Sequence, residues 1–478
     1  MNWLSPDATE VGYLLAAVCF ILALKGLSSP RTARRGNLVG AAGALVAVLV
    51  VFLSTDVEAD RLVPILVAMV VGTAIAVPAA RRVRMTQMPQ LVALFNGVGG
   101  GAAALVALLE LDAARVVADG WFSYPPDAVE GPAGPLAALL AISFTILVGA
   151  VSFAGSVVTF LKLQELITTR PVVFPGLPAA MVGVLAGSLV LATWLVGGAS
   201  LPVAVLLAVA GLVAGVLLVL PVGGADVPIA ISLLNAFTGL TVAAGGFVLG
   251  NTLLLVAGTL VGASGTILTR EMASAMGRSV TGILFGALRG GSTAGSQAVS
   301  DRPVRSVSAE DVAILLGYAS RVVVVPGYGL AVAQAQHTIR ELAEVLADRG
   351  IEVSYGIHAV AGRMPGHMNV LLAEANVPYE ALREMDEINP EFKTTDVALV
   401  VGANDVVNPA AKTSPGSPIY GMPILEVGEA RQVVFLKRSM RPGFAGIENE
   451  LLYEPRTGLL FGDAKQSLTK VLAAVKNL

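Results

Sequence analysis

Two groups of residues in the last third of this 478-residue chain have the types and spacing to hold an anionic ligand. In the first group, Gly327-Tyr328-Gly329 follows the β-branched run Arg321–Val325 after one proline, Pro326, and Val332 comes three residues after Gly329. In a strand–turn–helix unit the first glycine permits a tight turn, the second lets the backbone approach a pyrophosphate, and the helix N-terminus attracts the anion. This segment therefore predicts a nucleotide-binding turn.

The second group, Lys437-Arg438-Ser439, bears on which dinucleotide would bind. Sites for NAD usually carry Asp or Glu about 20 residues beyond the glycines, where the carboxylate binds the ribose 2′-hydroxyl. The expected second strand, 351–357, ends at Ile357-His358 without a carboxylate. Two adjacent cations and a hydroxyl can instead hold a 2′-phosphate, as can Arg363 in the loop after that strand. The residues favour NADP over NAD.

Other kinds of chemistry find no support in the sequence. His358 and His367 lack the Cys, Asp and His spacing of a zinc site, so no metal is predicted. Neither a Gly-x-Ser-x-Gly elbow nor a Walker Gly-Lys-Ser/Thr motif is present, which argues against a hydrolase or an ATPase. A net charge of −3 gives no indication of nucleic-acid binding. The single Cys19 cannot form an internal disulfide.

A Rossmann-like, doubly wound α/β domain would position these residues. From about residue 310, strand and helix patterns alternate, which is typical of a parallel sheet covered by helices. The expected helices are 330–348, which stops before Gly350, and 463–476. The expected strands are 321–325, 351–357, 396–401, 424–427 and 432–437.

The preceding part of the chain predicts about nine membrane-spanning α-helices. Crossing the hydrocarbon core takes about 20 mostly apolar residues, and this chain is 55% hydrophobic and only 14% charged. The uncharged stretches 171–225 and 227–269 are each too long for one span and must fold back at Gly, Pro or Asn residues. The expected spans are 10–27, 36–55, 62–79, 88–109, 134–161, 177–197, 201–220, 227–249 and 251–269.

The charges between the spans alternate in sign and predict an orientation. Because basic loops stay cytoplasmic, the N-terminus is expected outside and the C-terminal domain, after nine spans, inside. We expect a membrane domain at 1–270, an exit helix and linker at 271–309, and a soluble domain at 310–478. The basic residues that follow the first, third and fifth spans are Arg31, Arg34, Arg35, Arg81, Arg82, Arg84, Lys162 and Arg170.

Five segments resemble the β subunit of proton-translocating NAD(P) transhydrogenases. The resemblance extends over the whole chain, including Asn235–Gly239 in the eighth expected span, and a combination of five long motifs is highly specific. The segments are Val325–Gln336, Val360–Val370, Gly402–Asp405, Lys437–Met440 and Phe461–Lys465.

The resemblance implies an activity and partners. The C-terminal domain would bind NADP(H), inverted relative to ordinary Rossmann proteins, and a separate α subunit would supply the NAD(H) domain and further membrane helices. Hydride would pass directly between the two nicotinamides while a proton crosses the bacterial plasma (inner) membrane. A dimer of α–β units in the lipid bilayer is also expected.

The resemblance further implies which residues contact NADP(H). Asp405 is expected near the nicotinamide, where the protonation of a carboxylate could respond to the redox state of the cofactor, and Lys437 and Arg438 at the 2′-phosphate. The expected contacts are Gly327, Tyr328, Gly329, Val332, Val360, Ala361, Gly362, Arg363, Met364, Pro365, Gly402, Ala403, Asn404, Asp405, Val406, Gly421, Met422, Lys437, Arg438, Ser439, Met440, Arg441, Pro442, Gly443, Phe444, Asp463 and Ala464.

Polar residues within spans are costly and usually functional. The resemblance implicates Asn235 in proton conduction, and Asp226, the one ionisable residue between 171 and 269, lies at the expected cytoplasmic mouth. Many members of the family carry a histidine in the fourth span where this chain has Asn96, and no histidine precedes His337. Because asparagine does not titrate, a histidine relay would have to come from a partner subunit.

Two other functions stay open at the level of sequence. One is a transporter or channel whose soluble domain senses the redox state of a nucleotide without chemistry. The other is a membrane NADPH reductase, which would need a haem or flavin, and the spans contain no pair of histidines to ligate haem. Hydride transfer in the presence of the α subunit separates a transhydrogenase from a transporter.

Overall fold

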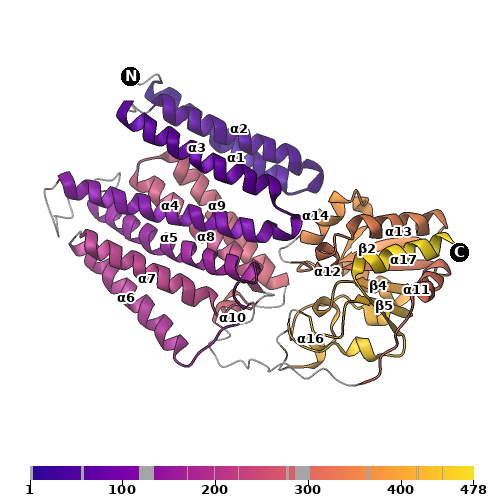
Figure 1. The fold of residues 1–478 in the computed structure, drawn as a ribbon. Helices are drawn as coiled ribbons and strands as arrows, with labels where there is room; N and C mark the ends of the chain where they lie inside the picture. Colours follow the sequence, from indigo (N-terminus) through magenta and orange to yellow (C-terminus); the bar gives the residue numbers. More distant parts are fainter. Residues whose placement is uncertain are drawn as a thin grey trace.

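The computed structural model describes residues 4–54, 59–117, 134–168, 171–198, 200–223, 226–275, 279–285, 302–362, 366–415, 417, 419–443 and 445–478. The chain folds into a bundle of long helices and a C-terminal domain built on a β-sheet (Figure 1). This arrangement confirms the predicted fold class, a multi-span helical domain followed by a doubly wound domain.

Nine helices in the described part of the chain are long and apolar enough to cross a membrane, as predicted. In several of them proline stands in the first turn, where its missing N–H has no partner to lose. The helices are α1 (Pro6–Leu27), α2 (Pro30–Ser54), α3 (Ala59–Arg82), α4 (Met88–Val117), α5 (Pro135–Leu163), α6 (Leu177–Gly197), α7 (Leu201–Val219), α8 (Val227–Val248) and α9 (Thr252–Ala275).

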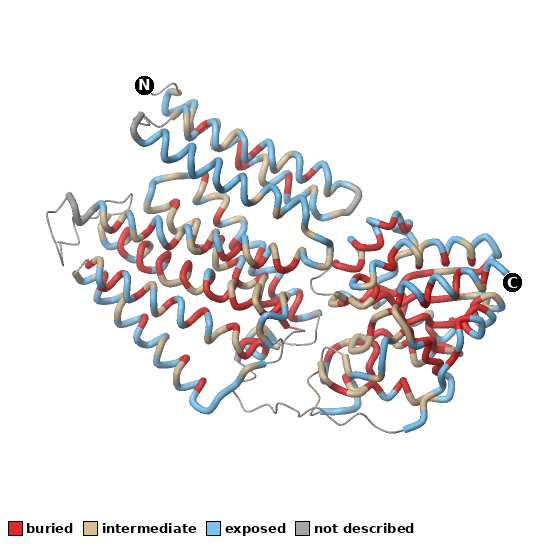
Figure 2. The backbone as a smooth tube through the Cα atoms, viewed as in Figure 1, coloured by how far each residue is buried: buried red, intermediate tan, exposed pale blue. Residues whose placement is uncertain are grey.

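Small residues let the helices at the centre of the bundle pack closely. A Cβ atom at Gly239 of α8 would lie 2.4 Å from the amide nitrogen of Gly262 on α9. One at Gly258 of α9 would lie 2.3 Å from that of Ala243 on α8. Any larger residue would push the two helices apart. α5 and α8 are the most buried spans, whereas α3 lies on the periphery (Figure 2).

Lys162, expected in a basic loop after the fifth span, lies instead within a helix. The helix α5 extends to Leu163, and the Lys162 side chain is completely buried. Its ammonium group donates to the carbonyl oxygens of Val219 (3.2 Å), Leu220 (2.6 Å) and Val222 (2.8 Å). Carbonyls at the end of a helix lack intrahelical partners, so Lys162 caps the end of α7.

The C-terminal domain contains a six-stranded parallel sheet with the order β3-β2-β1-β4-β5-β6. This is a doubly wound order in which the direction of strand addition reverses between β1 and β4. The strands are β1 (Arg321–Pro326), β2 (Glu352–Ile357), β3 (Leu382–Glu384), β4 (Val397–Val401), β5 (Gln432–Lys437) and β6 (Thr457–Phe461).

The predicted strand at 424–427 is wrong. Its first residues form no regular structure, and η8 (Val427–Glu429) is a 3-10 turn. The backbone of this segment bonds to loops: the carbonyl of Ile424 accepts from Asn389 Nδ2, and the amide of Leu425 donates to the carbonyl of Val406. The edge positions belong to β3 and β6, which the sequence analysis missed, so β5 is not the last strand.

The predicted helix at 330–348 is divided into α12 (Tyr328–Val332) and α13 (Gln336–Asp348). Between them, Gln334 has a φ of 50°, in the left-handed region that ends a right-handed helix. The amide of Ala335 bonds back to the carbonyl of Leu330 at 3.1 Å. The glycine turn is therefore followed by a helix of only five residues.

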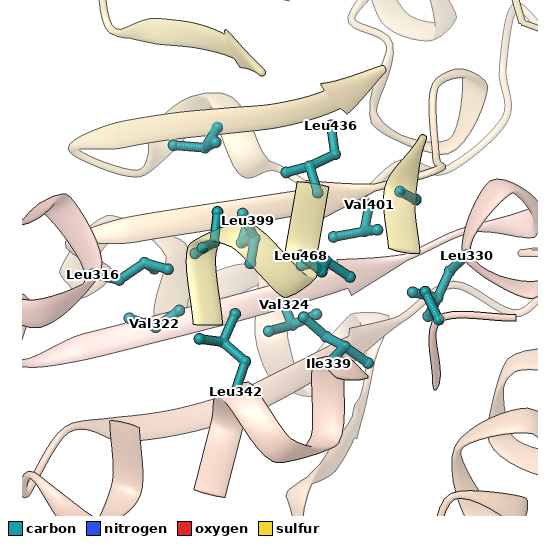
Figure 3. Close-up of a cluster of buried hydrophobic side chains, with 14 of the residues drawn as sticks. Leu316, Val322, Val324, Leu330, Ile339, Leu342, Leu399, Val401, Leu436 and Leu468 are labelled. Atoms are coloured by element: carbon teal, nitrogen blue, oxygen red, sulfur yellow. The ribbon is translucent and has the colours of Figure 1, made fainter. Parts of the chain in front are cut away.

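Helices and loops cover both faces of the sheet, because alternate strand residues point to opposite sides. On one face, Val324 and Leu399 pack against α11 (Ala309–Gly317), α13 and α17 (Ala464–Lys476), as Figure 3 shows. On the other, Phe435 packs against the segments around η8 and η9 (Glu450–Tyr453).

Candidate functional site

The carboxyl ends of neighbouring strands bring the predicted site residues to one edge of the sheet. The register pairs Pro326 of β1 with Val401 of β4, and Lys437 of β5 with Phe461 of β6. The turns that follow β1, β4 and β6 therefore lie beside Lys437, Arg438 and Ser439 at the end of β5. Ligands of open α/β sheets bind at this edge, beside the switch point.

The turns after β1 and β4 cross each other at backbone contact distance. The amide of Gly329 donates to the carbonyl of Gly402 at 2.9 Å. A Cβ at Gly327 would lie 2.4 Å from the Gly402 oxygen, and one at Gly402, whose φ is +69°, would lie 2.4 Å from Gly329 Cα. Glycine is therefore needed at these positions because the two turns pack against each other. The approach of a ligand to the backbone is a second reason.

A cavity of about 220 Å³ opens beside the crossed turns. Two of its lining residues, Leu436 and Gly462, were not predicted, although Gly462 lies within the Phe461–Lys465 motif. Three basic side chains in the lining favour an anionic ligand. The predicted contacts that line the cavity are Gly329, Gly402, Ala403, Asn404, Lys437, Arg438, Ser439, Arg441, Gly443 and Ala464.

A chain of polar groups ties β5 to the loop 438–447 beside the cavity. Lys437 Nζ donates to Asn404 Oδ1 (3.1 Å), and Asn404 Nδ2 donates to Asp405 Oδ1 (3.0 Å). Asp405 Oδ2 accepts from the amide of Ala445 (2.8 Å). Burial lowers the pKa of Lys437, and the Asp405 carboxylate opposes that shift. Asp405 thus holds the loop against the sheet.

Two buried asparagines that were not predicted as site residues bond to the segments that carry this network of polar groups. Asn449 Nδ2 donates to the carbonyl of Asn404 (3.1 Å), and Asn408 Nδ2 donates to the carbonyl of Glu448 (2.9 Å). Their partners lie about 40 residues away along the chain. No local pattern could have marked them, because the fold alone brings these segments together.

The spans contain a buried polar cluster centred on Asn96 of α4. Asn96 Nδ2 donates to Ser156 Oγ (3.0 Å) and to Ser152 Oγ (3.4 Å), both on α5. Ser152 Oγ lies 2.6 Å from Thr238 Oγ1 and 2.9 Å from the carbonyl oxygen of Leu234, both on α8. The Asn96 amide oxygen is buried without a partner among the described residues, so a water molecule could complete the cluster.

The two other predicted membrane residues lie outside the bonds of this cluster. Asn235 follows Leu234 directly, and its side chain is exposed on the surface of this chain. Asp226 is buried at the N-cap position of α8. Asn96 is thus hydrogen-bonded to the hydroxyl groups of Ser152 and Ser156, whereas Asn235 lies on an outer face of the bundle.

Comparisons with known proteins show what this architecture is similar to. The family model described as "NAD(P) transhydrogenase beta subunit" matches residues 9–474. Two relatives named NAD(P) transhydrogenase subunit beta, both from Rhodospirillum rubrum, are 48% identical over 476 residues, which cover 99% of this chain and 100% of each relative. This chain belongs to the NAD(P) transhydrogenase β-subunit family. It is a component of an enzyme complex and a multi-pass membrane protein.

In this transhydrogenase β subunit, several expected NADP(H) contacts lie away from the cavity lining. Asp463 is the N-cap of α17, and its carboxylate accepts from two amides of that helix. Tyr328 opens α12, with its ring centroid 6.2 Å from that of His367. The others are Gly327, Val332, Val360, Ala361, Gly362, Asp405, Val406, Gly421, Met422, Met440 and Pro442. The expected contacts Arg363, Met364, Pro365 and Phe444 lie outside the described residues.

Proposed function

We propose that this β subunit binds NADP(H) in the cavity at the sheet edge. The observation that carries the proposal is the triplet Lys437-Arg438-Ser439, with two cations and a hydroxyl, beside the crossed glycine turns. No carboxylate stands at the end of β2. Arg438 and Ser439 are exposed at the cavity and can pair with a 2′-phosphate. Gly329 and Gly402 offer backbone without a Cβ on the neighbouring wall.

Bound NADP(H) supplies or accepts the hydride, and the residues of this chain hold and orient it. We place Asp405 near the nicotinamide, where its charge can respond to the redox state. Because Asp405 Oδ2 accepts from the Ala445 amide, protonation of the carboxyl would weaken a charge-assisted hydrogen bond to the loop. The closure of the 438–447 loop would then follow the state of the cofactor.

The NAD(H) site belongs, in this proposal, to an α subunit that also supplies further membrane helices. Direct transfer needs the donor and acceptor carbons within about 3–3.5 Å, and the described sheet carries one crossed-glycine turn for one dinucleotide. The exposed Asn235 lies on a face that such helices could cover. We further propose a dimer of α–β units.

The proton path runs, we propose, past Asn235 and opens near Asp226 on the cytoplasmic side, with the cluster around Asn96 beside it. The N-terminus would lie outside the plasma (inner) membrane and the C-terminal domain in the cytoplasm. Arg31, Arg34 and Arg35 lie at the start of α2, and Arg81, Arg82 and Arg84 lie at or just after the end of α3, which supports this orientation. Arg170 lies outside the described residues.

The test begins with calorimetric titration of the purified chain with NADP⁺ and NAD⁺. We expect NADP⁺ to bind at least about tenfold more tightly, a difference of about 1.4 kcal/mol. The chain and its α subunit are then reconstituted in vesicles, where NADPH should reduce an NAD analogue and move protons. Equal affinities would contradict the assigned cofactor, and proton movement without hydride transfer would favour a transporter.

A further inference from the structure

Val360 belongs to the C-terminal domain, and its side chain packs against the membrane domain as well as against its own domain. It lies on the loop after β2 and is partly buried. On the membrane side it packs against an apolar cluster that contains Ile229 of α8, Met272 of α9 and Ile283 of α10 (Val280–Phe285). On the other side it packs against a second cluster, which contains Met422 of the segment before β5.

His358 fixes the position of this valine. The amide of Val360 donates to His358 Nδ1 (3.2 Å), so Nε2 carries the proton and donates to the carbonyl of Pro423 (2.8 Å). The imidazole is almost completely buried. One ring therefore joins the loop after β2 to the segment 421–424. The amide of Val360 is thus bonded within the loop after β2, and its side chain packs against the cluster that contains Met422.

The membrane cluster that Val360 contacts belongs to helices with internal polar connections. Ile229 lies three residues after Asp226, near the start of α8. Further along the same helix, Ser232 Oγ accepts from Thr269 Oγ1 of α9 at 3.0 Å. Close glycine packing holds α8 and α9 together at backbone contact distance. A shift at Ile229 would thus reach the polar residues of both spans.

The arrangement of the two parts agrees with this contact. Figure 1 shows α12 and α14 (His367–Glu374) on the side of the C-terminal domain that faces the helical bundle, and the C-terminus on the opposite side. The turn η1 (Met85–Gln87), between α3 and α4, also contacts α12. The nucleotide-binding edge of the sheet therefore faces the membrane helices.

We propose that Val360, held by His358, is the positioning residue that transmits the state of the nucleotide site to the start of α8 and the end of α9. The inference rests on the proposed binding of NADP(H). Ala445 packs against the same cluster as Val360, and its amide donates to Asp405 beside the cavity, so a change at the bound dinucleotide would reach Val360 through this cluster. Ile283 of α10 completes the contact from the membrane side. Val360 thereby acts through the helices and does not touch the transferred proton.

The first test weakens the contact from its membrane side, away from the nucleotide site. In vesicles that contain the complete α–β complex, we compare the wild type with Ile283→Ala and with Ile267→Ala, which alters an exposed isoleucine on α9. For Ile283→Ala we expect the number of protons moved per hydride to fall at least threefold, while the NADP⁺ affinity changes less than twofold. Ile267→Ala should match the wild type in both measurements.

An unchanged proton-to-hydride ratio in Ile283→Ala would overturn the proposal. Failure of the wild-type complex to bind NADP⁺ would instead overturn the proposed function, so the two failures can be told apart. A loss of both NADP⁺ affinity and hydride transfer in Ile283→Ala would contradict a role confined to coupling.

A second test does not depend on activity. In a Cys19→Ala background, Val360→Cys is combined with Ile283→Cys, and the complex is treated with a short bismaleimide. Linked peptides are then measured by mass spectrometry. We expect a link whose yield differs at least twofold between NADP⁺ and NADPH saturation, and none for Val360→Cys with Ile267→Cys. No link, or the same yield in both redox states, would overturn the proposal.

Discussion

At the scale of single residues, the adjacent cations Lys437 and Arg438 differ in burial and in hydrogen bonding. Lys437 is half-buried and donates to Asn404, so its charge stabilises the network that ends at Asp405. Arg438 is exposed at the cavity. Arginine presents a planar fork that matches phosphate oxygens. The structure therefore makes Arg438 the better candidate for 2′-phosphate recognition and Lys437 its support.

We expect Arg438→Ala to weaken NADP⁺ binding and leave NAD⁺ binding unchanged. The loss of one charged hydrogen-bond partner costs about 1.5–3 kcal/mol, which corresponds to a rise in Kd of roughly 10- to 150-fold. Titration calorimetry of the full chain with each dinucleotide measures both. Lys470→Ala, an exposed cation on α17, is the matched control, and an Arg438→Ala variant with wild-type NADP⁺ affinity would remove this residue from the site.

We expect Asn235→Leu to abolish proton pumping and coupled hydride transfer while NADP⁺ binding is unchanged. Leucine fills a similar volume but removes the amide that would hold water on the outer face of α8. A pH-sensitive dye in vesicles that contain the α–β complex measures the proton. Ser264→Ala removes a hydroxyl from an exposed position on α9 and serves as the control. Wild-type proton movement by Asn235→Leu would place the path elsewhere.

At the scale of elements, most residues that line the cavity lie in short connections after strands and few lie in helices. The helix behind the glycine turn has five residues, so it offers little of the dipole that a long helix would give. In the proposed site, anion binding then depends on the crossed turns and on Lys437 and Arg438. The crossing leaves no room for a Cβ at Gly402.

We expect Gly402→Ala to destabilise the C-terminal domain and to abolish NADP⁺ binding. Gly350→Ala is the matched control, because Gly350 has a similarly positive φ of +82° but no neighbour within 4 Å of the position that an alanine methyl group would take. Both variants lose about 1–2 kcal/mol to the left-handed backbone. Gly402→Ala should lose about 1–3 kcal/mol more through overpacking. Hydrogen exchange of β1 and β4 amides in the full chain measures the difference, and equal losses would contradict the crossing.

The buried imidazole of His358, which bonds to the Val360 amide and the Pro423 carbonyl, predicts a pH dependence of the free energy of unfolding. Burial lowers the pKa of His358 below its usual 6.5, and the hydrogen bond to Pro423 opposes the shift. Between the lowered value and 6.5 the unfolded chain binds the proton more strongly, so the free energy of unfolding falls as the pH drops below about 6.5. Hydrogen exchange of β2 amides between pH 7.5 and about 5 should show this loss.

His358→Gln should flatten that part of the pH profile, since glutamine does not titrate. The carboxylates of Asp311 and Asp396 have pKa values below their usual 3.8, chiefly because backbone amides donate to them. Their stabilisation is lost only in more acidic solution, as the pH falls through those lowered values. A profile between pH 7.5 and about 5 that is the same in wild type and variant would contradict the assigned role of His358.

At the scale of the whole molecule, two differently built domains meet beside the carboxyl edge of the sheet. The helical bundle is held by close packing of small residues, and the C-terminal domain by a sheet buried on both faces. The side chain of Val360 packs against apolar clusters of both domains. A reaction that links a soluble cofactor to a membrane path requires a contact of this kind.

We expect the purified chain without an α subunit to bind NADP(H) but to catalyse no transhydrogenation. One dinucleotide site cannot bring two nicotinamides to the separation of about 3–3.5 Å that hydride transfer needs. Spectrophotometry of an NAD analogue with NADPH, before and after addition of the α subunit, measures this. Turnover by the chain alone would show that it carries a second site.

The sequence by itself determined the nine spans, the doubly wound class and the residues gathered at the sheet edge. The hydropathy of a span and the glycines of a turn are local properties of the sequence. They can therefore be recognised without knowing which distant segments pack beside them. The tertiary structure decided the edge strands β3 and β6, the buried cap at Lys162 and the exposure of Asn235. It also decided the double contact of Val360. Each of these depends on segments distant along the chain, because burial and pairing are set by what packs alongside and not by the residue itself.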